Sequence, residues 1–234
     1  MDSFRFKQFE IRQDRCAMKV GTDGVLLGAW ASGGRRILDI GSGTGLISLM
    51  MAQRFPHAEV VGIDMDEAAC GQAQENVAKS PFSRRVSIEH CRLQDFLLSA
   101  GESSWFDSIV SNPPFFVNSL KNPNSQRAMA RHADTLPFRD LLSGVKRLLA
   151  EDGVFSVIVP KEVVDEMVTE ACLVGFYLVR QCAVKTVERK TPKRYLLAFS
   201  RHRLGKVEMT TELMTEDSGR RSAWYQEITS EFYL

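Results

Sequence analysis

The sequence predicts an α/β protein with a mostly parallel β-sheet and helices on both faces. Two observations support this class. A glycine-rich turn at 41–45 separates a strand-like apolar run from a helix-like run, and the two patterns continue to alternate from Arg36 onward. A chain of 234 residues is long enough for one such domain with a proper core. We expect a single domain, with an N-terminal flap (1–34), a core (35–204) and a C-terminal extension (205–234).

The N-terminal segment alternates aromatic and basic residues. Phe4, Phe6 and Phe9 stand among arginines and lysines, which fits either a hairpin whose rings cover the core or a flap beside a pocket. A loop then enters an apolar helix near residues 22–30, with Thr22 or Asp23 as the expected N-cap.

The first strand of the sheet is expected at 37–40 and is followed by Gly41, Gly43 and Gly45. A turn with glycines at alternate positions allows a ligand to approach the backbone closely, next to free N–H groups at the start of a helix. The spacing is G-x-G-x-G and not the G-x-G-x-x-G of dinucleotide-binding proteins. Asp39 also disfavours that class, because its carboxylate would repel a pyrophosphate.

The second strand, 59–64, ends in Asp64. An acid at this position of a nucleotide-binding α/β fold accepts hydrogen bonds from ribose hydroxyls. Asp66 is the expected N-cap of a helix that runs to Lys79. A third strand at 86–91 precedes a loop at 92–96 that carries Asp95, which can be either a ligand contact or a helix N-cap.

The fourth strand, 105–111, runs directly into Asn112-Pro113-Pro114-Phe115. Two prolines after a strand cannot donate to the sheet, and they hold the backbone in a fixed extended turn. The motif should therefore project from the carboxyl edge of the sheet, where open α/β sheets bind ligands.

The rest of the chain continues the pattern. The long polar segment 117–137 is expected to be a substrate lid, because long loops at this edge are usually functional. Helices are expected at 138–149 and 162–173, and strands at 153–159, 176–187 and 195–201, with one more possible strand near Val207.

Composition excludes several classes. The 30 basic and 29 acidic residues leave a net charge of +1, so no global field attracts nucleic acid and any basic surface is local. The five cysteines form no C-x-x-C pair and the histidines no H-x-x-x-H pair, so we expect no metal site. The charged N-terminus and the lack of a long apolar run indicate a cytoplasmic protein that does not bind membranes, which we expect to be a monomer.

Two motifs carry a family resemblance. The glycine turn resembles motif I of the class I S-adenosylmethionine-dependent methyltransferases, and Asn112-Pro113-Pro114-Phe115 resembles the [Asn/Asp/Ser]-Pro-Pro-[Tyr/Phe] motif of enzymes that methylate planar nitrogens. The resemblance implies a Rossmann-like, seven-stranded sheet with a terminal antiparallel hairpin, and S-adenosylmethionine as cofactor. The implied cofactor-binding residues are Asp39, Gly41, Gly43, Gly45, Asp64 and Asp95, the last as acceptor for the adenine amino group.

The second motif suits methylation of an amine whose lone pair is delocalised. The Asn112 side-chain oxygen and the Pro113 carbonyl can each accept one N–H, which localises the lone pair on the nitrogen. Phe115 supplies a face for the substrate plane. We therefore assign Asn112, Pro113, Pro114 and Phe115 as the catalytic residues.

Over nearly the full length the sequence resembles the bacterial tRNA(Val) adenine-37 N6-methyltransferases. The matching stretches are 6–9, 14–24, 72–76 and 232–234. This resemblance implies methylation of N6 of adenine 37, beside the anticodon. Phe115 is also common in guanine-N2 enzymes of ribosomal RNA, so that class stays open. Glutamine-N5 protein methyltransferases and a non-catalytic RNA-binding protein are further alternatives.

An almost neutral protein needs a local cationic surface to hold tRNA. Basic residues cluster at the turn of the expected hairpin, which is either a solvated turn or the rim of the pocket. The candidate substrate-binding residues are Lys19, Arg127, Arg131, Lys190, Lys193 and Arg194.

Overall fold

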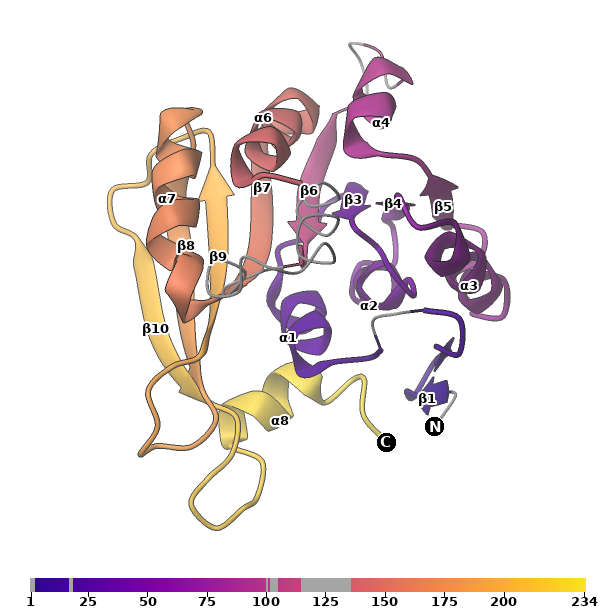
Figure 1. Ribbon diagram of the computed structural model, residues 1–234. Coiled ribbons are helices and arrows are strands. Elements are labelled where there is room, and N and C mark those ends of the chain that lie inside the picture. The colour runs from indigo at the N-terminus through magenta and orange to yellow at the C-terminus, as the bar shows by residue number, and fades with distance from the viewer. Residues whose placement is uncertain (1–2, 17–18, 100, 102–104, 115–135) are drawn as a thin grey trace, which may run out of the picture.

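The computed structural model describes residues 3–16, 19–99, 101, 105–114 and 136–234. Its main feature is an eight-stranded β-sheet in the order β10-β8-β9-β7-β6-β3-β4-β5 (Figure 1). A separate pair of short strands, β1 and β2, lies near the N-terminus. The α/β class predicted from the sequence is confirmed.

The elements have the following bounds. The strands are β1 (Ser3–Arg5), β2 (Glu10–Arg12), β3 (Arg36–Ile40), β4 (Glu59–Asp64), β5 (Val86–His90), β6 (Phe106–Ser111), β7 (Leu149–Pro160), β8 (Tyr177–Lys185), β9 (Arg194–Ser200) and β10 (Glu208–Leu213). The helices are α1 (Thr22–Trp30), α2 (Leu46–Arg54), α3 (Glu67–Ala78), α4 (Leu93–Ser99), α6 (Phe138–Leu148), α7 (Val164–Leu173), α8 (Ala223–Thr229) and the short 3₁₀ helix η2 (Lys161–Val163).

The sheet is parallel except at one strand. β5, β4, β3, β6 and β7 pair in parallel in that spatial order, whereas β9 is antiparallel to both β7 and β8. This confirms the mostly parallel sheet with an antiparallel hairpin. The expected number of seven strands is wrong, because β10 adds a further edge strand that pairs in parallel with β8. Parallel pairing joins distant segments through a crossover, so local sequence does not reveal it.

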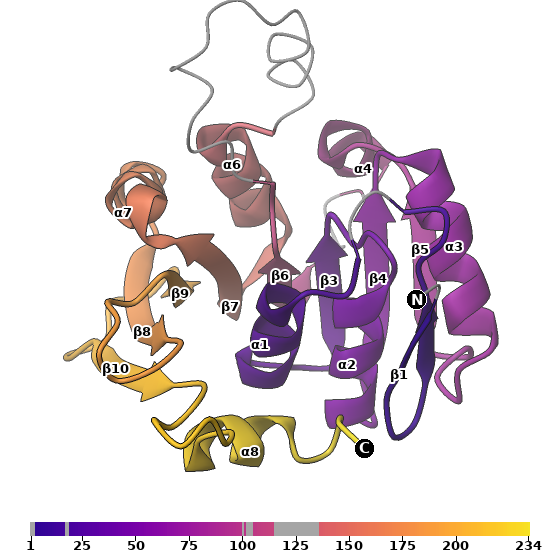
Figure 2. The same cartoon turned by 60° about the horizontal axis from the view of Figure 1, so that its bottom comes forward.

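Side chains alternate between the two faces along each strand. Ile37 packs in one cluster of buried residues with α1, α2 and α3, while the adjacent Leu38 packs in a second cluster with α4, α6 and α7. Figure 2 shows α1 and α2 in front of the strands and α6 behind them. The sheet is therefore covered on both faces, which explains why its strands are nearly continuous apolar runs.

The N-terminal hairpin of β1 and β2 packs its aromatic rings into the molecule. Phe6 and Phe9 are buried, and the Phe6 ring stacks on Phe9 and Tyr233 with centroid distances of 4.7 and 5.9 Å. The Lys7 amide donates to the Phe232 carbonyl at 2.8 Å. The N-terminal hairpin and the C-terminal residues are therefore in contact, next to α8 and away from the carboxyl edge of the parallel strands (Figure 2).

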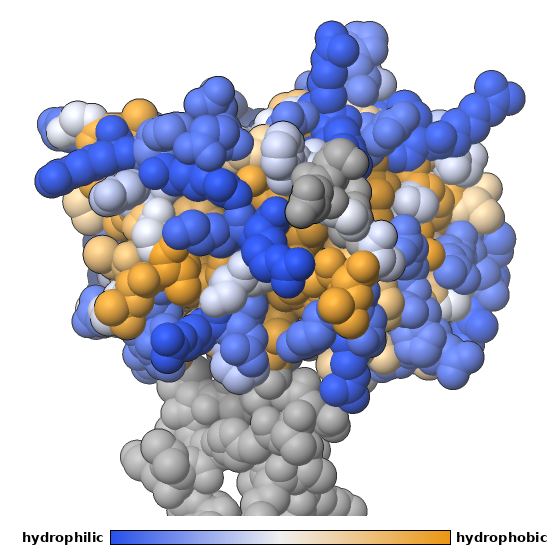
Figure 3. All heavy atoms as spheres, turned by 90° about the horizontal axis from the view of Figure 1, so that it is seen from above, coloured by the Kyte–Doolittle hydropathy of each residue, from blue (hydrophilic) through white to orange (hydrophobic). Residues whose placement is uncertain are grey.

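The surface over α4, α6 and α7 is mostly hydrophilic, with apolar patches between charged side chains (Figure 3). The most exposed large apolar side chains on these helices are Leu98 on α4 and Leu173 on α7. No helix among the described residues is long and apolar enough to cross a membrane.

The segments that carry the predicted site residues meet at the carboxyl edge of the parallel strands. β3, β4 and β6 end there at Ile40, Asp64 and Ser111. Pro160, at the end of β7, pairs in register with Arg194 at the start of β9, so the β8–β9 turn lies at the same edge.

The expected loop at 92–96 is wrong, because α4 begins at Leu93. The expected lid at 117–137 lies outside the described residues except for its last two positions.

Candidate active site

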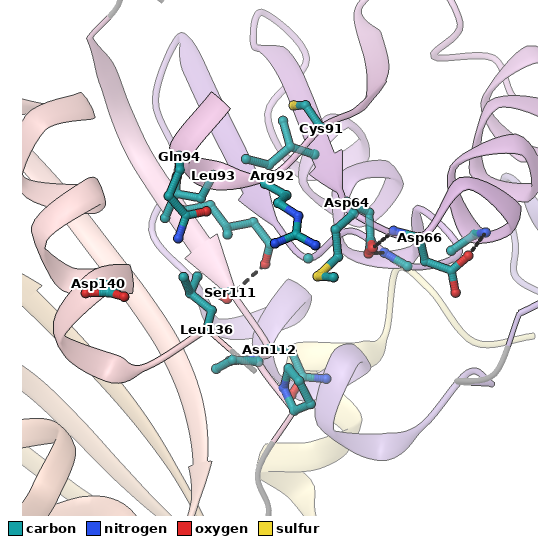
Figure 4. Close-up of a pocket in the computed structure, with 18 of the residues that line it drawn as sticks. Asp64, Asp66, Cys91, Arg92, Leu93, Gln94, Ser111, Asn112, Leu136 and Asp140 are labelled. Carbon is teal, nitrogen blue, oxygen red and sulfur yellow. Dashed lines mark hydrogen bonds between the residues drawn. The ribbon is translucent and has the colours of Figure 1, made fainter. Parts of the chain in front are cut away.

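A cavity of about 570 Å³ opens at this edge, above the ends of β3, β4 and β6 (Figure 4). Its walls combine backbone of the glycine turn, apolar side chains and a few polar groups. The lining residues include Cys16, Ile40, Gly41, Gly43, Ile63, Asp64, Met65, Asp66, Arg92, Leu93, Gln94, Ser111, Asn112, Pro113, Pro114 and Asp140. A concave, largely apolar site with a few convergent polar groups is typical of small-molecule binding.

The glycine turn forms the floor of this cavity. Gly41, Gly43 and Gly45 have φ angles of 77°, 53° and 79°, which favour glycine. A Cβ built on Gly41 or Gly43 would meet no atom within 4 Å, so open space lies above both. Gly45 does not line the cavity. It begins α2 and packs close to Ala73, where a Cβ would approach to 3.3 Å.

Asp64 stands at the wall of the cavity, at the end of β4. One carboxylate oxygen accepts from the Gly43 amide at 2.8 Å, and the other accepts from the Asp66 amide at 2.9 Å. Asp66 in turn caps α3, as predicted, by accepting from the amides of Ala68 and Ala69. A carboxylate has about four acceptor positions, so Asp64 retains capacity for hydroxyl donors from a ligand.

Asn112, Pro113 and Pro114 follow β6 directly and face the cavity (Figure 4). Pro113 is buried and Asn112 is half-buried. The Ser111 hydroxyl donates to the Ile40 carbonyl at 2.8 Å, which ties the base of the motif to the strand that carries the glycine turn. Phe115 lies outside the described residues.

A second cavity of about 640 Å³ adjoins the first. The two share Gly41, Gly43, Asn112, Pro113 and Pro114. The charged residues that line the second cavity in the described chain are Lys19, Asp23 and Arg194, and Arg194 forms an ion pair with Asp23. The motif after β6 therefore lies where one ligand can meet another.

The candidate substrate-binding residues fall into three groups. Lys19 and Arg194 line the second cavity. Lys190 and Lys193 are exposed on the β8–β9 turn, at the same edge of the sheet. Arg127 and Arg131 lie outside the described residues.

The sequence matches known methyltransferases. A family model described as "Methyltransferase domain" matches residues 31–208. The tRNA1(Val) (adenine(37)-N6)-methyltransferase of Bacteroides thetaiotaomicron is 50% identical over 235 residues, which cover 99% of this chain and 97% of the relative. The protein of the same name from Aeromonas hydrophila is 42% identical over 99% of this chain and 97% of its own length.

The chain belongs to this methyltransferase family. Solved structures agree at the level of fold. A predicted O-methyltransferase from Agrobacterium tumefaciens superimposes with a TM-score of 0.68 at 18% identity, covering 90% of this chain and 96% of that one. The glycopeptide N-methyltransferase MtfA, solved in complex with S-adenosylmethionine, gives a TM-score of 0.54 at 13% identity, covering 79% and 90%.

Within this methyltransferase fold, Asp95 is exposed on the first turn of α4 and does not line the cavity, whereas Arg92, Leu93 and Gln94 do. The start of α4 at Leu93 directs these neighbours inward. Sequence reasoning did not single out Arg92 or Gln94, because nothing in their local pattern distinguishes them from other residues after a strand. The pairing of Asp23 with Arg194 was missed for the same reason. Neither Thr22 nor Asp23 caps α1, which begins after Gly21 without a side-chain cap.

Among the described residues, no three histidine, cysteine or acidic side chains are grouped to hold a metal ion. Two of the carboxylates that line the cavity bind backbone amides. Asp64 binds backbone amides, and Asp66 caps a helix.

Asp39 lies beneath the glycine turn and is fully buried. The Ser48 hydroxyl donates to one of its oxygens at 2.7 Å, and the other oxygen has no partner in the structure. Burial raises the pKa of Asp39 from 3.8 to about 7, the nearby Asp64 charge adds to the shift, and the Ser48 hydrogen bond opposes it. Asp39 lines neither of the two cavities.

The raised pKa predicts a pH-dependent stability. Well below pH 3.8 Asp39 is neutral in both the folded and unfolded chain. As the pH rises toward 7, the unfolded state releases the proton and the folded state keeps it, so the free energy of unfolding falls. Asp39→Asn removes this loss. Relative to wild type, the variant should therefore gain up to about 4 kcal/mol between low and neutral pH, measured by urea unfolding across a pH series.

Ser48→Ala is the matched partner for this test. It removes the donor that stabilises the ionised carboxylate, which raises the folded-state pKa of Asp39 further, so the fall in stability should extend to higher pH and become larger in total. Parallel curves for wild type and Asp39→Asn would contradict the assignment.

Proposed function

We propose that this protein transfers a methyl group from S-adenosylmethionine to N6 of adenine 37 in tRNA1(Val). The observation that carries the proposal is the position of Asn112-Pro113-Pro114 between two adjoining cavities, because methyl transfer requires donor and acceptor to meet at one point. Relatives that match almost the whole chain at 42–50% identity bear the name of this activity.

The first cavity fits the cofactor. Open space above Gly41 and Gly43 leaves room for a ligand against the backbone, and Asp64 offers acceptors for ribose hydroxyls. Three carboxylates against one guanidinium line this cavity in the described chain, namely Asp64, Asp66 and Asp140 against Arg92. The excess of negative charge suits a ligand with a sulfonium and an ammonium group. Bound there, S-adenosylmethionine supplies an electrophilic methyl group on a positively charged sulfur.

The second cavity has the opposite balance of charge. Lys19 and Arg194 outnumber Asp23 among its charged lining residues in the part of the chain that the structure describes. This excess favours a nucleotide of a polyanion, so the acceptor is assigned to this side. A base stacked in the anticodon loop must leave its stack to enter the cavity.

At the shared wall, Asn112 and Pro113 orient the acceptor amine. The Asn112 side-chain oxygen and the Pro113 carbonyl accept its two N–H groups, so that the lone pair of the nitrogen is directed at the methyl group. This is catalysis by positioning, which can contribute roughly 7–11 kcal/mol in well-aligned model reactions. In the proposal Phe115 provides the stacking surface for the base.

The activity is tested directly on tRNA. Purified protein, labelled S-adenosylmethionine and tRNA lacking the modification should yield N6-methyladenosine at position 37, identified by mass spectrometry of nuclease fragments. Label on guanine would contradict the proposal and indicate a guanine-N2 methyltransferase. Label on protein and not on RNA would indicate a protein methyltransferase. No transfer at all would indicate an RNA-binding protein without this activity.

Asn112→Ala should slow methyl transfer by about two orders of magnitude and leave cofactor affinity nearly unchanged, because Asn112 is assigned to the acceptor. The activation barrier should rise by about 3 kcal/mol, by analogy with the removal of one oxyanion-hole donor. Single-turnover rates and calorimetry with S-adenosylhomocysteine measure the two quantities. Gln94→Ala is the control for a change on the cofactor side of the site, because Gln94 lines the first cavity but not the second. Loss of cofactor binding in Asn112→Ala would show that the roles are misassigned.

Asp64→Ala should weaken cofactor binding. Two hydrogen bonds to a charged acceptor are lost, each worth roughly 1.5–3 kcal/mol, and the Gly43 amide loses its partner as well. Saturating cofactor should restore much of the rate. Glu67→Ala is a control of the same charge type on the first turn of α3, outside the cavity. Equal affinities of Asp64→Ala and wild type would count against this placement of the cofactor.

Neutralising Lys190, Lys193 and Arg194 together, each to Gln, should weaken binding of all tRNAs alike. Each phosphate contact contributes to the salt dependence, so the slope of log K against log salt should fall by up to about 2–3 units. Arg194 should contribute less to this change than an unpaired arginine would, because it forms an ion pair with Asp23.

The control for this variant neutralises Arg35, Lys79 and Arg84, which are exposed at the amino edge of the sheet. The measurement is filter binding across a salt series. If both triple variants show the same slope, the tRNA docks elsewhere.

A further inference from the structure

We propose that Gln72 and Asn76 of α3 are positioning residues for methyl transfer, because they fix the segment that walls both cavities. This inference rests on the proposed function. The segment is called the N-terminal wall and consists of the described residues 12–16 and 19–21. Cys16 from this wall lines the first cavity, and Lys19 lines the second.

Asn76 joins the N-terminal wall to the glycine turn. Its side-chain oxygen accepts from the Arg12 amide at 2.9 Å, and its nitrogen donates to the Arg12 and Thr44 carbonyls, each at 2.9 Å. Asn76 is only 1% exposed. A buried amide with three backbone partners holds those partners in one geometry, since leaving any of them unpaired is costly.

Gln72 holds the next part of the wall. Its oxygen accepts from the Arg15 amide at 3.1 Å, and the side chain is fully buried. Glu75 adds an ion pair with the Arg15 guanidinium. Positions 72, 75 and 76 are separated by three and four residues, so they share one face of α3. Each of the three side chains on that face contacts the wall.

Much of the wall is exposed at this edge, although Gln13 is buried. Asp14, Arg15 and Lys19 are exposed, and Cys16 and Val20 are only partly buried. Segments with few buried apolar contacts are the least stable parts of a fold. The polar contacts from α3, with the Val20 amide that donates to Gln13 at 2.7 Å, therefore decide where Cys16 and Lys19 stand.

Loss of these contacts should displace the wall and leave the core intact. Because one segment reaches both cavities, its displacement should raise KM for the cofactor and for tRNA together. A change that damaged only the cofactor site would not raise KM for tRNA.

Alkylation of Cys16 reports the position of the wall. Burial and the charges of Asp66 and Asp64 raise the pKa of Cys16 to about 11, so the thiol should react slowly with N-ethylmaleimide while the wall is in place. S-adenosylhomocysteine in the first cavity should slow it further. Cys172, which is exposed on α7, serves as an internal reference when the sites are mapped by mass spectrometry.

The test compares Gln72→Met with Gln74→Met. Both remove an amide from α3, but the side chain of Gln74 donates to the Ile88 carbonyl of β5, whereas that of Gln72 accepts from the Arg15 amide of the wall. In Gln72→Met, Cys16 should react about tenfold faster, protection by S-adenosylhomocysteine should shrink, and KM for both substrates should rise about tenfold, as expected for one lost hydrogen bond. Gln74→Met should match wild type, and Cys172 should react equally in all proteins.

Glu75→Gln is a second test of the proposal. It removes the exposed charge partner of Arg15 without disturbing the core, and it should raise Cys16 reactivity about twofold. If neither Gln72→Met nor Glu75→Gln alters Cys16 relative to Cys172, the proposal is overturned. The alkylation readout needs only the cofactor product, so it stands even if the wild-type protein does not methylate tRNA.

Discussion

The hydrogen bond from the Gly43 amide to the Asp64 carboxylate is the contact on which the geometry of the site depends. It fixes the turn after β3 against the end of β4, and the second oxygen of the same carboxylate holds the amide of Asp66, the residue that caps α3. Asn76, further along α3, returns to the glycine turn by donating to the Thr44 carbonyl. These polar contacts form a closed path around the floor of the first cavity, and a carboxylate bound by backbone amides is among the stronger links available to a protein.

The order of the sheet explains how two cavities come to share one wall. β6 lies beside β3, so Asn112 stands next to Gly41 although the chain between them forms two other strands and their helices. The cavities differ in charge, with an excess of carboxylates in the first and an excess of cations in the second among the described residues. A nearly neutral protein can in this way present opposite fields to a cationic cofactor and a polyanionic substrate, because the fields are local.

Much of this could be predicted from local patterns. The strand that ends in Asp64 was predicted with the bounds that the structure has, because a short apolar run between turn signals identifies a buried strand. The Asp66 cap was predicted from the chemistry of helix N-termini. Asn112, placed at the carboxyl edge by its position after a strand, lies there because all parallel strands end at one edge. The assigned roles of these residues in catalysis and cofactor binding stay predictions.

By itself the sequence determined most of the segments that form strands and helices, though not α4, and which motifs end at the carboxyl edge, since periodicity, caps and turn residues act over a few positions. Tertiary structure alone decided that β10 joins the sheet beside β8, that Asp23 pairs with Arg194, and that Gln72 and Asn76 hold the N-terminal wall. It also decided that Asp95 faces solvent while its neighbours line the cavity. Each of these outcomes depends on which distant segment packs nearby, and a single sequence carries no local signal for that choice.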